Sequence, residues 1–254
     1  AQLVLFAEGA LTGYVFTPEA LETALSLDDA PVQSLQRLAR AEGIGIVVGA
    51  IERDGTQRHV SQFVLLPDGR RMINRKHRLT PAEKEAGIVP GPEERLIFEL
   101  NNVKYGCTIC ADSGIEGLMP TLRKANCQVR LASVGGGGER SMRCSPSALT
   151  DPDERDTYLE RMEKVCFVGD AQRLSAEYGI ACLAVNLAGD DGVSKYHPGH
   201  SSLVDCRGHV VALHPGEYVP EWLEPKLLYG DVTIETLYLL HHKMKETTMT
   251  PREL

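Results

Sequence analysis

Short apolar runs alternate with polar turns and with segments of helical spacing along this chain. The clearest apolar runs, at 2–7, 44–51 and 103–109, have the length and the bounding turns of strands. Residues 31–42 instead repeat apolar side chains on one helical face and stop before Gly43, which predicts a helix that ends at a glycine. The chain therefore mixes strands and helices, as α/β proteins do.

Many of the predicted strands come in pairs that are joined by short turns. Such hairpins are predicted at 62–66 with 71–74, at 96–100 with 103–109, and at 202–205 with 209–213. The pattern is completed by a long helix at 153–178, a strand at 227–233 and a terminal helix at 234–246. Hairpins favour largely antiparallel sheets with helices on their outer faces, and no shift in composition divides residues 1–254 into separate domains.

Composition narrows the classes of function that the chain could have. Apolar residues make up 43% of the 254 residues, which is enough for a continuous core, and the formal net charge is −8. Because no basic stripe is present, the chain is not expected to bind nucleic acid. No apolar run approaches the roughly 20 residues that span a membrane. Seven cysteines without framework spacing favour reduced thiols and a cytoplasmic setting.

Three reactive side chains, Glu8, Lys76 and Cys110, come directly after predicted strands or one residue later. Ligand sites in open α/β sheets gather outside the carboxyl ends of strands, so we expect these side chains to meet. A thiol, a carboxylate and an ammonium are the parts of a cysteine acyl-transfer enzyme, in which they serve as nucleophile, general base and oxyanion stabiliser.

Each of these residues also has an ordinary structural interpretation. A lone cysteine is usually a small buried hydrophobe, and Glu8 could be an exposed carboxylate at a strand end. Lys76 lies in a basic cluster, and most such clusters are solvated. Glu83 follows Thr80-Pro81, where a glutamate often caps a helical turn. The functional hypothesis therefore depends on all of these residues meeting in one place.

Several short motifs between residue 3 and about 213 resemble those of the carbon–nitrogen hydrolase (nitrilase) superfamily. The motifs are Phe6-Ala7-Glu8 with Thr12-Gly13-Tyr14, Arg75-Lys76-His77-Arg78-Leu79 with Glu83, Cys110-x-Asp112 with Glu116, and later Asn186…Gly189 and Gly199-His200-Ser201 with Asp205. Each motif is weakly specific alone, whereas their common order and spacing are specific.

The resemblance implies a Glu-Lys-Cys triad with an auxiliary glutamate. Cys110 would be the nucleophile, Glu8 the general base, and Lys76 the stabiliser of the tetrahedral oxyanion. Glu83 would orient the substrate nitrogen or the lysine. The implied reaction hydrolyses a C–N bond through a thioester and requires no metal and no cofactor.

The resemblance also implies a fold and an assembly. The fold is a four-layer α-β-β-α sandwich, and the helix near 153–178 is a candidate interface of a homodimer or larger homo-oligomer. Members of this family usually carry one strand and one helix ahead of the strand that bears the base. We expect those elements to lie ahead of Ala1, outside the sequence given. Ala7 and Ile115 replace prolines of the family pattern, so the two loops are expected to differ in shape.

Substrate clues come from residues near the expected nucleophile. Ala111 stands where nitrile-hydrolysing members commonly have tryptophan, which favours a small amide or an N-carbamoyl compound. We also place Glu116 and Asn186 beside the substrate. Arg140 and Arg143, in a glycine-rich loop, could bind a substrate carboxylate, although surface charges on such a loop are the commoner case.

Three alternatives stay open at this point. The chain could belong to the nitrile-hydrolysing branch of the family. It could be a catalytically silent relative that serves as a binding scaffold, although all four polar residues are present. Finally, Cys107-x-x-Cys110 could be a redox pair or half of a zinc site, but Cys107 is predicted inside a strand and no second Cys-x-x-Cys exists.

Overall fold

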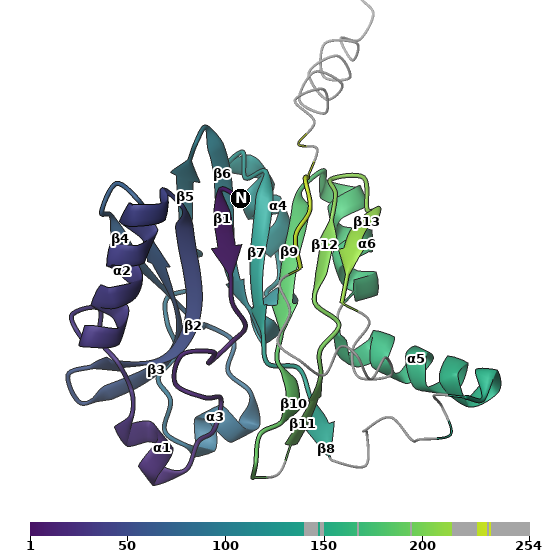
Figure 1. Ribbon diagram of the computed structural model, residues 1–254, viewed down its shortest axis with the longest axis horizontal. Coiled ribbons are helices and arrows are strands. Elements are labelled where there is room, and N and C mark those ends of the chain that lie inside the picture. The colour runs from purple at the N-terminus through teal and green to yellow at the C-terminus, as the bar shows by residue number, and fades with distance from the viewer. Residues whose placement is uncertain are drawn as a thin grey trace, which may run out of the picture.

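Two sheets packed face to face, with helices outside them, form the architecture of the computed structural model (Figure 1). The structure describes residues 1–139, 147, 150–166, 168–193, 195–214, 228–232 and 234. The prediction of a four-layer α-β-β-α sandwich is confirmed.

The first sheet is four-stranded, with its strands in sequence order. The strands are β1 (Leu3–Leu5), β2 (Gly45–Asp54), β3 (Gln57–Leu65) and β4 (Arg71–Arg75). β1 runs parallel to β2, whereas β2–β3 and β3–β4 are antiparallel hairpins. Helix α2 (Ala30–Glu42) covers the outer face and ends at Gly43, whose φ of 64° is left-handed, as the glycine predicted.

The second sheet is six-stranded, in the order β13-β12-β9-β7-β6-β5. Its strands are β5 (Ile97–Leu100), β6 (Val103–Ile109), β7 (Val129–Val134), β9 (Ala181–Asn186), β12 (Ser202–Val204) and β13 (Val210–Leu213). The central pairs β6–β7 and β7–β9 are parallel, and the outer pairs are antiparallel. The predicted hairpins are therefore present, around a parallel centre.

A small third sheet lies beside the ends of the two large ones (Figure 1). It consists of β10 (Ala188–Asp190), β11 (Lys195–Pro198) and β8 (Gly138–Glu139), all paired antiparallel. β8 follows β7 after a short loop, and β10 follows β9. This sheet therefore extends two neighbouring strands of the second sheet past the edge where the reactive residues are expected.

The remaining helices are short, apart from two that were predicted as one. They are α1 (Pro18–Glu22), α3 (Pro81–Glu85), the 3-10 turn η1 (Cys110–Gly114), α4 (Leu118–Lys124), α5 (Pro152–Cys166) and α6 (Val168–Tyr178). The single helix predicted at 153–178 is wrong. α6 packs on β9 and β12, whereas α5 projects away from the sheets (Figure 1), so the two follow different directions. The sequence between them carries no helix-breaking residue that would indicate this change.

The strand predicted at 227–233 is also wrong over the part that the structure describes. Residues 228–232 form no strand. Val232 and Ile234 instead pack against the core between the sheets, so they contribute apolar side chains without strand hydrogen bonds. The terminal helix predicted at 234–246 lies outside the described residues, apart from Ile234.

Alternation along the strands divides the core into layers. On β2 and β3, Val47 and Val64 face the second sheet, whereas Ile46, Val48 and Phe63 face α2. Because both faces of these strands are covered, they are apolar without a break over 45–51 and 63–65. The core between the sheets therefore fixes how the ends of β1, β4, β6 and β7 sit relative to one another.

Candidate active site

Glu8 lies just beyond β1, where the chain leaves the first sheet. Its N–H donates to the carbonyl of Val134 at the end of β7, across 3.4 Å. Gly49 of β2 lies against this segment, because a Cβ at position 49 would be 2.3 Å from the carbonyl oxygen of Ala7 and 2.8 Å from Cα of Glu8. Only glycine lets the backbone come this close. The Glu8 side chain is thereby held fully buried.

Lys76 follows β4 and reaches two carboxylates at once. Its Nζ lies 2.7 Å from Oε1 of Glu8 and 2.6 Å from Oε1 of Glu83, and all three side chains are fully buried. The backbone N–H of Lys76 donates to the carbonyl of Val60 on β3, which fixes the start of the side chain. One ammonium thus serves two carboxylates, and this cluster combines residues up to 75 positions apart (8 to 83).

The two side-chain oxygens of Glu83 have different partners, one in a helix cap and the other on Lys76. Oε2 accepts the N–H of Thr80 at 2.6 Å, and the N–H of Glu83 donates to Oγ1 of Thr80 at 3.4 Å, which makes a capping box at the start of α3. Oε1 accepts from Lys76. The cap therefore fixes the rotamer of the carboxylate that the lysine needs.

Tyr14 completes this cluster, although the sequence reasoning assigned it no role. Its hydroxyl donates to Oε1 of Glu83 at 2.7 Å and lies 3.5 Å from Nζ of Lys76. Burial and the charge of Glu8 raise the pKa of Tyr14, so it remains a neutral donor. Tyr14 belongs to the Thr12-Gly13-Tyr14 motif, but the sequence pattern did not distinguish it from an aromatic side chain of the core.

Cys110 begins the 3-10 turn η1 at the end of β6, in the second sheet. Its φ of 42° is left-handed, which is uncommon for a residue other than glycine. The side chain is partly exposed, unlike the buried Cys107 three residues earlier. The N–H of Gly135, just after β7, hydrogen-bonds to Cys110, and both Glu8 and Lys76 act on it electrostatically. The structure therefore brings the thiol, the carboxylate and the ammonium together.

The protonation states follow from burial. Burial raises the pKa of Glu8 from 4.5 to about 7, since the nearby Lys76 offsets only part of the cost of burying a charge. Burial and the charge of Glu8 raise the pKa of Cys110 to about 12. Burial lowers the pKa of Lys76, but the negative charges of Glu8, Cys110 and Glu83 outweigh it and raise the pKa overall. At neutral pH the site therefore holds a thiol, an ammonium and a carboxylate that is poised to accept a proton.

Asp112 holds the lysine loop against the cysteine turn, and this role was not predicted. Its fully buried carboxylate accepts the N–H groups of His77 and Arg78 at 3.0 and 2.9 Å, and that of Ile109 at 3.2 Å. Arg95 donates to the same carboxylate at 2.8 Å and to the carbonyl of Arg75 at 2.9 Å. These bonds therefore fix the segments next to Lys76 and next to Cys110 relative to each other.

A second support lies on the opposite wall, in the loop 135–137. A Cβ at Gly135 would lie 2.7 Å from Oε2 of Glu8 and 3.0 Å from the ring of Tyr14, so this position has no room for a side chain. The side-chain amide of Asn186 donates to the carbonyls of Gly136 at 3.1 Å and Gly199 at 2.9 Å. Asn186 therefore holds the loop that contacts Cys110, and its buried Oδ1 has no partner within the described residues.

A buried polar network ties the two sheets together behind these residues. Ser133 on β7 donates to the carbonyl of Phe6 at 2.8 Å and accepts from Gln62 on β3 at 2.9 Å. Asn74, two residues before Lys76, donates to Gln62 at 3.0 Å. The network therefore connects the segments that carry Glu8 and Lys76 to the second sheet.

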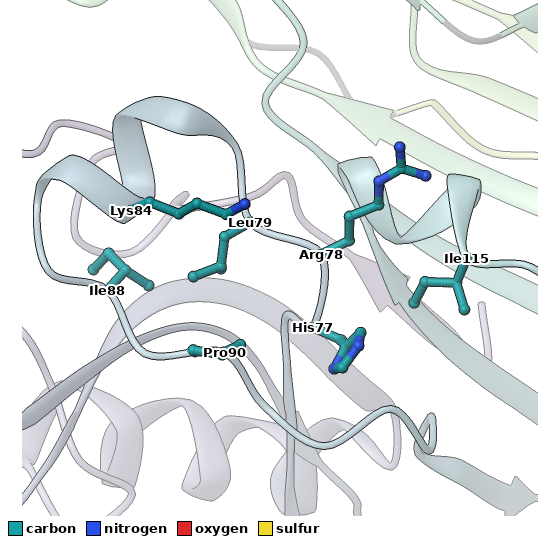
Figure 2. Close-up of a pocket in the computed structure, with 7 residues that line it drawn as sticks. All are labelled: His77, Arg78, Leu79, Lys84, Ile88, Pro90 and Ile115. Carbon is teal, nitrogen blue, oxygen red and sulfur yellow. The ribbon is translucent and has the colours of Figure 1, made fainter.

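An open cavity of about 680 Å³ lies against the segment 77–79 that follows Lys76 (Figure 2). Its lining consists of His77, Arg78, Leu79, Lys84, Ile88, Pro90 and Ile115. Several of these residues adjoin Lys76, Glu83 or the cysteine turn in sequence. The four candidate catalytic side chains are not part of the lining, so this cavity is adjacent to the site rather than the site itself.

A model of the carbon-nitrogen hydrolase family matches residues 1–241. The chain belongs to that family. The nitrilase blr3397 of Bradyrhizobium diazoefficiens is 29% identical over 276 aligned residues, which cover 92% of this carbon-nitrogen hydrolase and 74% of the nitrilase.

Solved structures share the fold at low sequence identity. The CN-hydrolase superfamily protein XC1258 of Xanthomonas campestris, which carries an arsenic adduct in its active site, aligns with a TM-score of 0.70 and 17% identity over 100% of this chain and 86% of that one. An amidase variant from Nesterenkonia sp. AN1, with acrylamide added at the active-site cysteine, aligns with a TM-score of 0.68 and 19% identity over 97% and 86%.

The other predicted site residues of this carbon-nitrogen hydrolase have different positions. Ala111 is half-buried in η1, directly after Cys110. Glu116 is exposed beyond the turn, and within the described part of the chain it makes no ion pair with the buried cluster, so the structure does not bring it to the other candidates. Arg140 and Arg143 lie outside the described residues.

The Cys107-x-x-Cys110 alternative is not favoured. Cys107 packs in the core between the sheets, whereas Cys110 lies in the turn at the strand end. Burial raises the pKa of Cys107 and also keeps its sulfur out of reach of a substrate, whereas Cys110 is partly exposed. None of the helices in the described part of this carbon-nitrogen hydrolase is long and apolar enough to cross a membrane.

Proposed function

We propose that this carbon-nitrogen hydrolase cleaves the C–N bond of a small amide or N-carbamoyl compound through a thioester on Cys110. The observation that carries the proposal is the buried cluster in which Lys76 Nζ lies 2.7 and 2.6 Å from Glu8 and Glu83, with Cys110 in electrostatic contact. A buried lysine shared by two carboxylates is costly to fold, and chemistry at the adjacent thiol explains its presence.

Glu8 acts as the general base for the attack. The pKa of the Cys110 thiol lies well above that of the Glu8 carboxyl, so complete proton transfer is unfavourable and the thiolate does not accumulate. The proton instead moves to Glu8 as Sγ bonds to the carbonyl carbon. Oε2 of Glu8 has no partner within the described residues and is the oxygen available to receive it.

Lys76 stabilises the oxyanion that forms. Two of its three N–H donors are directed to Glu8 and Glu83, and the third makes only a long bond of 3.5 Å to the hydroxyl of Tyr14, which the developing negative charge can replace. The C–N bond then breaks, and the leaving nitrogen takes the proton from Glu8. Water attacks the thioester while Glu8 accepts a proton from it, and the acid is released as the thiol is regenerated.

Mass spectrometry of the protein mixed with a substrate panel tests this proposal. We expect an acyl adduct on Cys110 and release of ammonia or an amine, both lost in Cys110→Ala. The matched control is Cys107→Ala, which removes the other thiol of the pair and should leave the adduct in place. Turnover that persists in Cys110→Ala would contradict the mechanism, and the absence of turnover across a broad panel would favour a binding scaffold.

Nitrile hydrolysis is the second candidate, because the relative from Bradyrhizobium diazoefficiens is a nitrilase. The same cluster could add Cys110 to a nitrile carbon, which would lead to the same thioester after water enters and ammonia leaves. Pairs of an amide and a nitrile with the same carbon skeleton distinguish the two. We expect ammonia release to be faster from the amide, and faster release from the nitrile would assign the chain to the other branch.

A further inference from the structure

Lys195 brings a second ammonium to the edge of the catalytic cluster. It begins β11 of the small third sheet, and its Nζ lies 5.8 Å from the centre of the Tyr14 ring. The hydroxyl of that ring bonds to Glu83 and lies 3.5 Å from Nζ of Lys76. Both ammoniums therefore lie near the Tyr14 ring, that of Lys76 at 5.7 Å and that of Lys195 at 5.8 Å from its centre.

Lys195 has no carboxylate within ion-pair distance among the residues that the structure describes. Its backbone N–H donates to Asp191 at 2.9 Å, and in the described part of the chain the contact of its ammonium is the ring of Tyr14. The side chain is half-buried rather than fully solvated. A cation over an aromatic ring gains about 0.5–2 kcal/mol and keeps its full charge, so it can still bind an anion.

The net charge of the site indicates what the Lys195 ammonium could bind. Glu8 and Glu83 bring two carboxylates and Lys76 brings one ammonium, so an anionic substrate would be repelled without further positive charge. Gly135, which contacts Cys110, lies against both Glu8 and the Tyr14 ring. The Tyr14 ring therefore adjoins both the Lys195 ammonium and the loop residue that contacts Cys110.

We propose that Lys195 is a specificity-determining residue that binds the carboxylate of an anionic amide substrate. This inference rests on the proposed amide hydrolysis and names the substrate class for it. A substrate that ends in a carboxylate pairs with Lys195, whereas one that ends in a methyl group buries the ammonium without a partner. Selection therefore comes both from the attraction and from the cost of the unpaired charge.

Kinetics with matched substrates test the inference. The probes are amides with two, three or four methylene groups that end either in a carboxylate or in a methyl group. For the tail that fits, we expect kcat/KM to be about tenfold to a hundredfold higher with the carboxylate, which is the range of a charged hydrogen bond. Lys195→Met should remove this preference, mainly by raising KM for the carboxylate-ended amide, and Lys195→Arg should restore part of it. The control is Lys124→Met, which removes an exposed charge on α4 and should leave the preference unchanged.

Two kinetic outcomes would overturn the inference. Equal losses of kcat/KM for both kinds of substrate in Lys195→Met would show that Lys195 acts through Tyr14 or the fold, and no loss for either would show that it selects nothing. If the unaltered protein hydrolyses no amide, calorimetry of the binding of both kinds of amide to Cys110→Ala tests the inference separately from the reaction. Tighter binding of the carboxylate-ended amide that is lost with Lys195→Met would keep the inference and end the proposed reaction, whereas equal binding would end both.

Discussion

Replacing Glu8 by glutamine should stabilise the protein at alkaline pH and abolish its turnover. Burial raises the pKa of Glu8 from 4.5 to about 7. Because the folded pKa lies above the unfolded one, the fold favours the protonated form. The contribution of Glu8 to stability is therefore fully present below about pH 4.5 and is lost as the pH rises through about 7. The whole difference is about 3 kcal/mol. Glutamine resembles the protonated acid and does not titrate.

Urea unfolding of both proteins at about pH 5 and about pH 8 measures this effect. The free energy of unfolding of Glu8→Gln, relative to the unaltered protein, should rise by about 2–3 kcal/mol between the two conditions. Subtracting one protein from the other removes the contribution of groups that titrate equally in both. Glu99→Gln, which alters an exposed carboxylate on β5, is the control and should show no such rise.

Two results would refute this reasoning. A stability difference that stays constant between pH 5 and 8 would mean that burial does not raise the pKa of Glu8. A difference that grows as expected, in a variant that still turns over substrate, would mean that the carboxylate is buried as described but is not the base.

Three further predictions concern the same cluster. The kcat/KM should rise with pH and level off above about 7, since only ionised Glu8 accepts the thiol proton, and a profile without a transition near neutrality would contradict its role. Gly135→Ala should lower kcat at least about tenfold without unfolding the protein, because the new Cβ would lie 2.7 Å from Oε2 of Glu8; unchanged kcat would show that the wall can move. Asp112→Asn should cost about 3–5 kcal/mol in urea unfolding, because it leaves the buried Arg95 unpaired, and Asp112→Asn with Arg95→Met should recover part of that loss; equal stabilities would contradict the clamp.

Local pattern was enough to predict most of the strands and the residues at their ends. Glu8, Lys76 and Cys110 each follow an apolar run, and the resemblance gave Glu83 a role beside them. Spacing could not show that Glu83 both caps α3 and holds Lys76, because each oxygen has its own partner. Nor could it find Arg95, whose bond to Asp112 depends on how two loops pack.

The two wrong predictions, at 153–178 and 227–233, also concern contacts that depend on how distant segments pack. Residues 153–178 have helical spacing throughout, but packing on β9 and β12 fixes only α6 against the sheet. Val232 and Ile234 have the apolar character of a strand and do reach the core, yet strand pairing also needs a neighbour with free backbone groups. Apolar composition thus predicts that a segment is buried, but it does not predict which neighbouring segment pairs or packs with it.

The proposed nucleophile and its proposed proton acceptor belong to different halves of the sandwich. Glu8, Lys76 and Glu83 extend from the first sheet, and Cys110 and Gly135 from the second. A chain in which only one half has formed lacks the pairing of thiol and base that the proposed reaction needs. Turnover should therefore appear only after the two sheets have docked against each other.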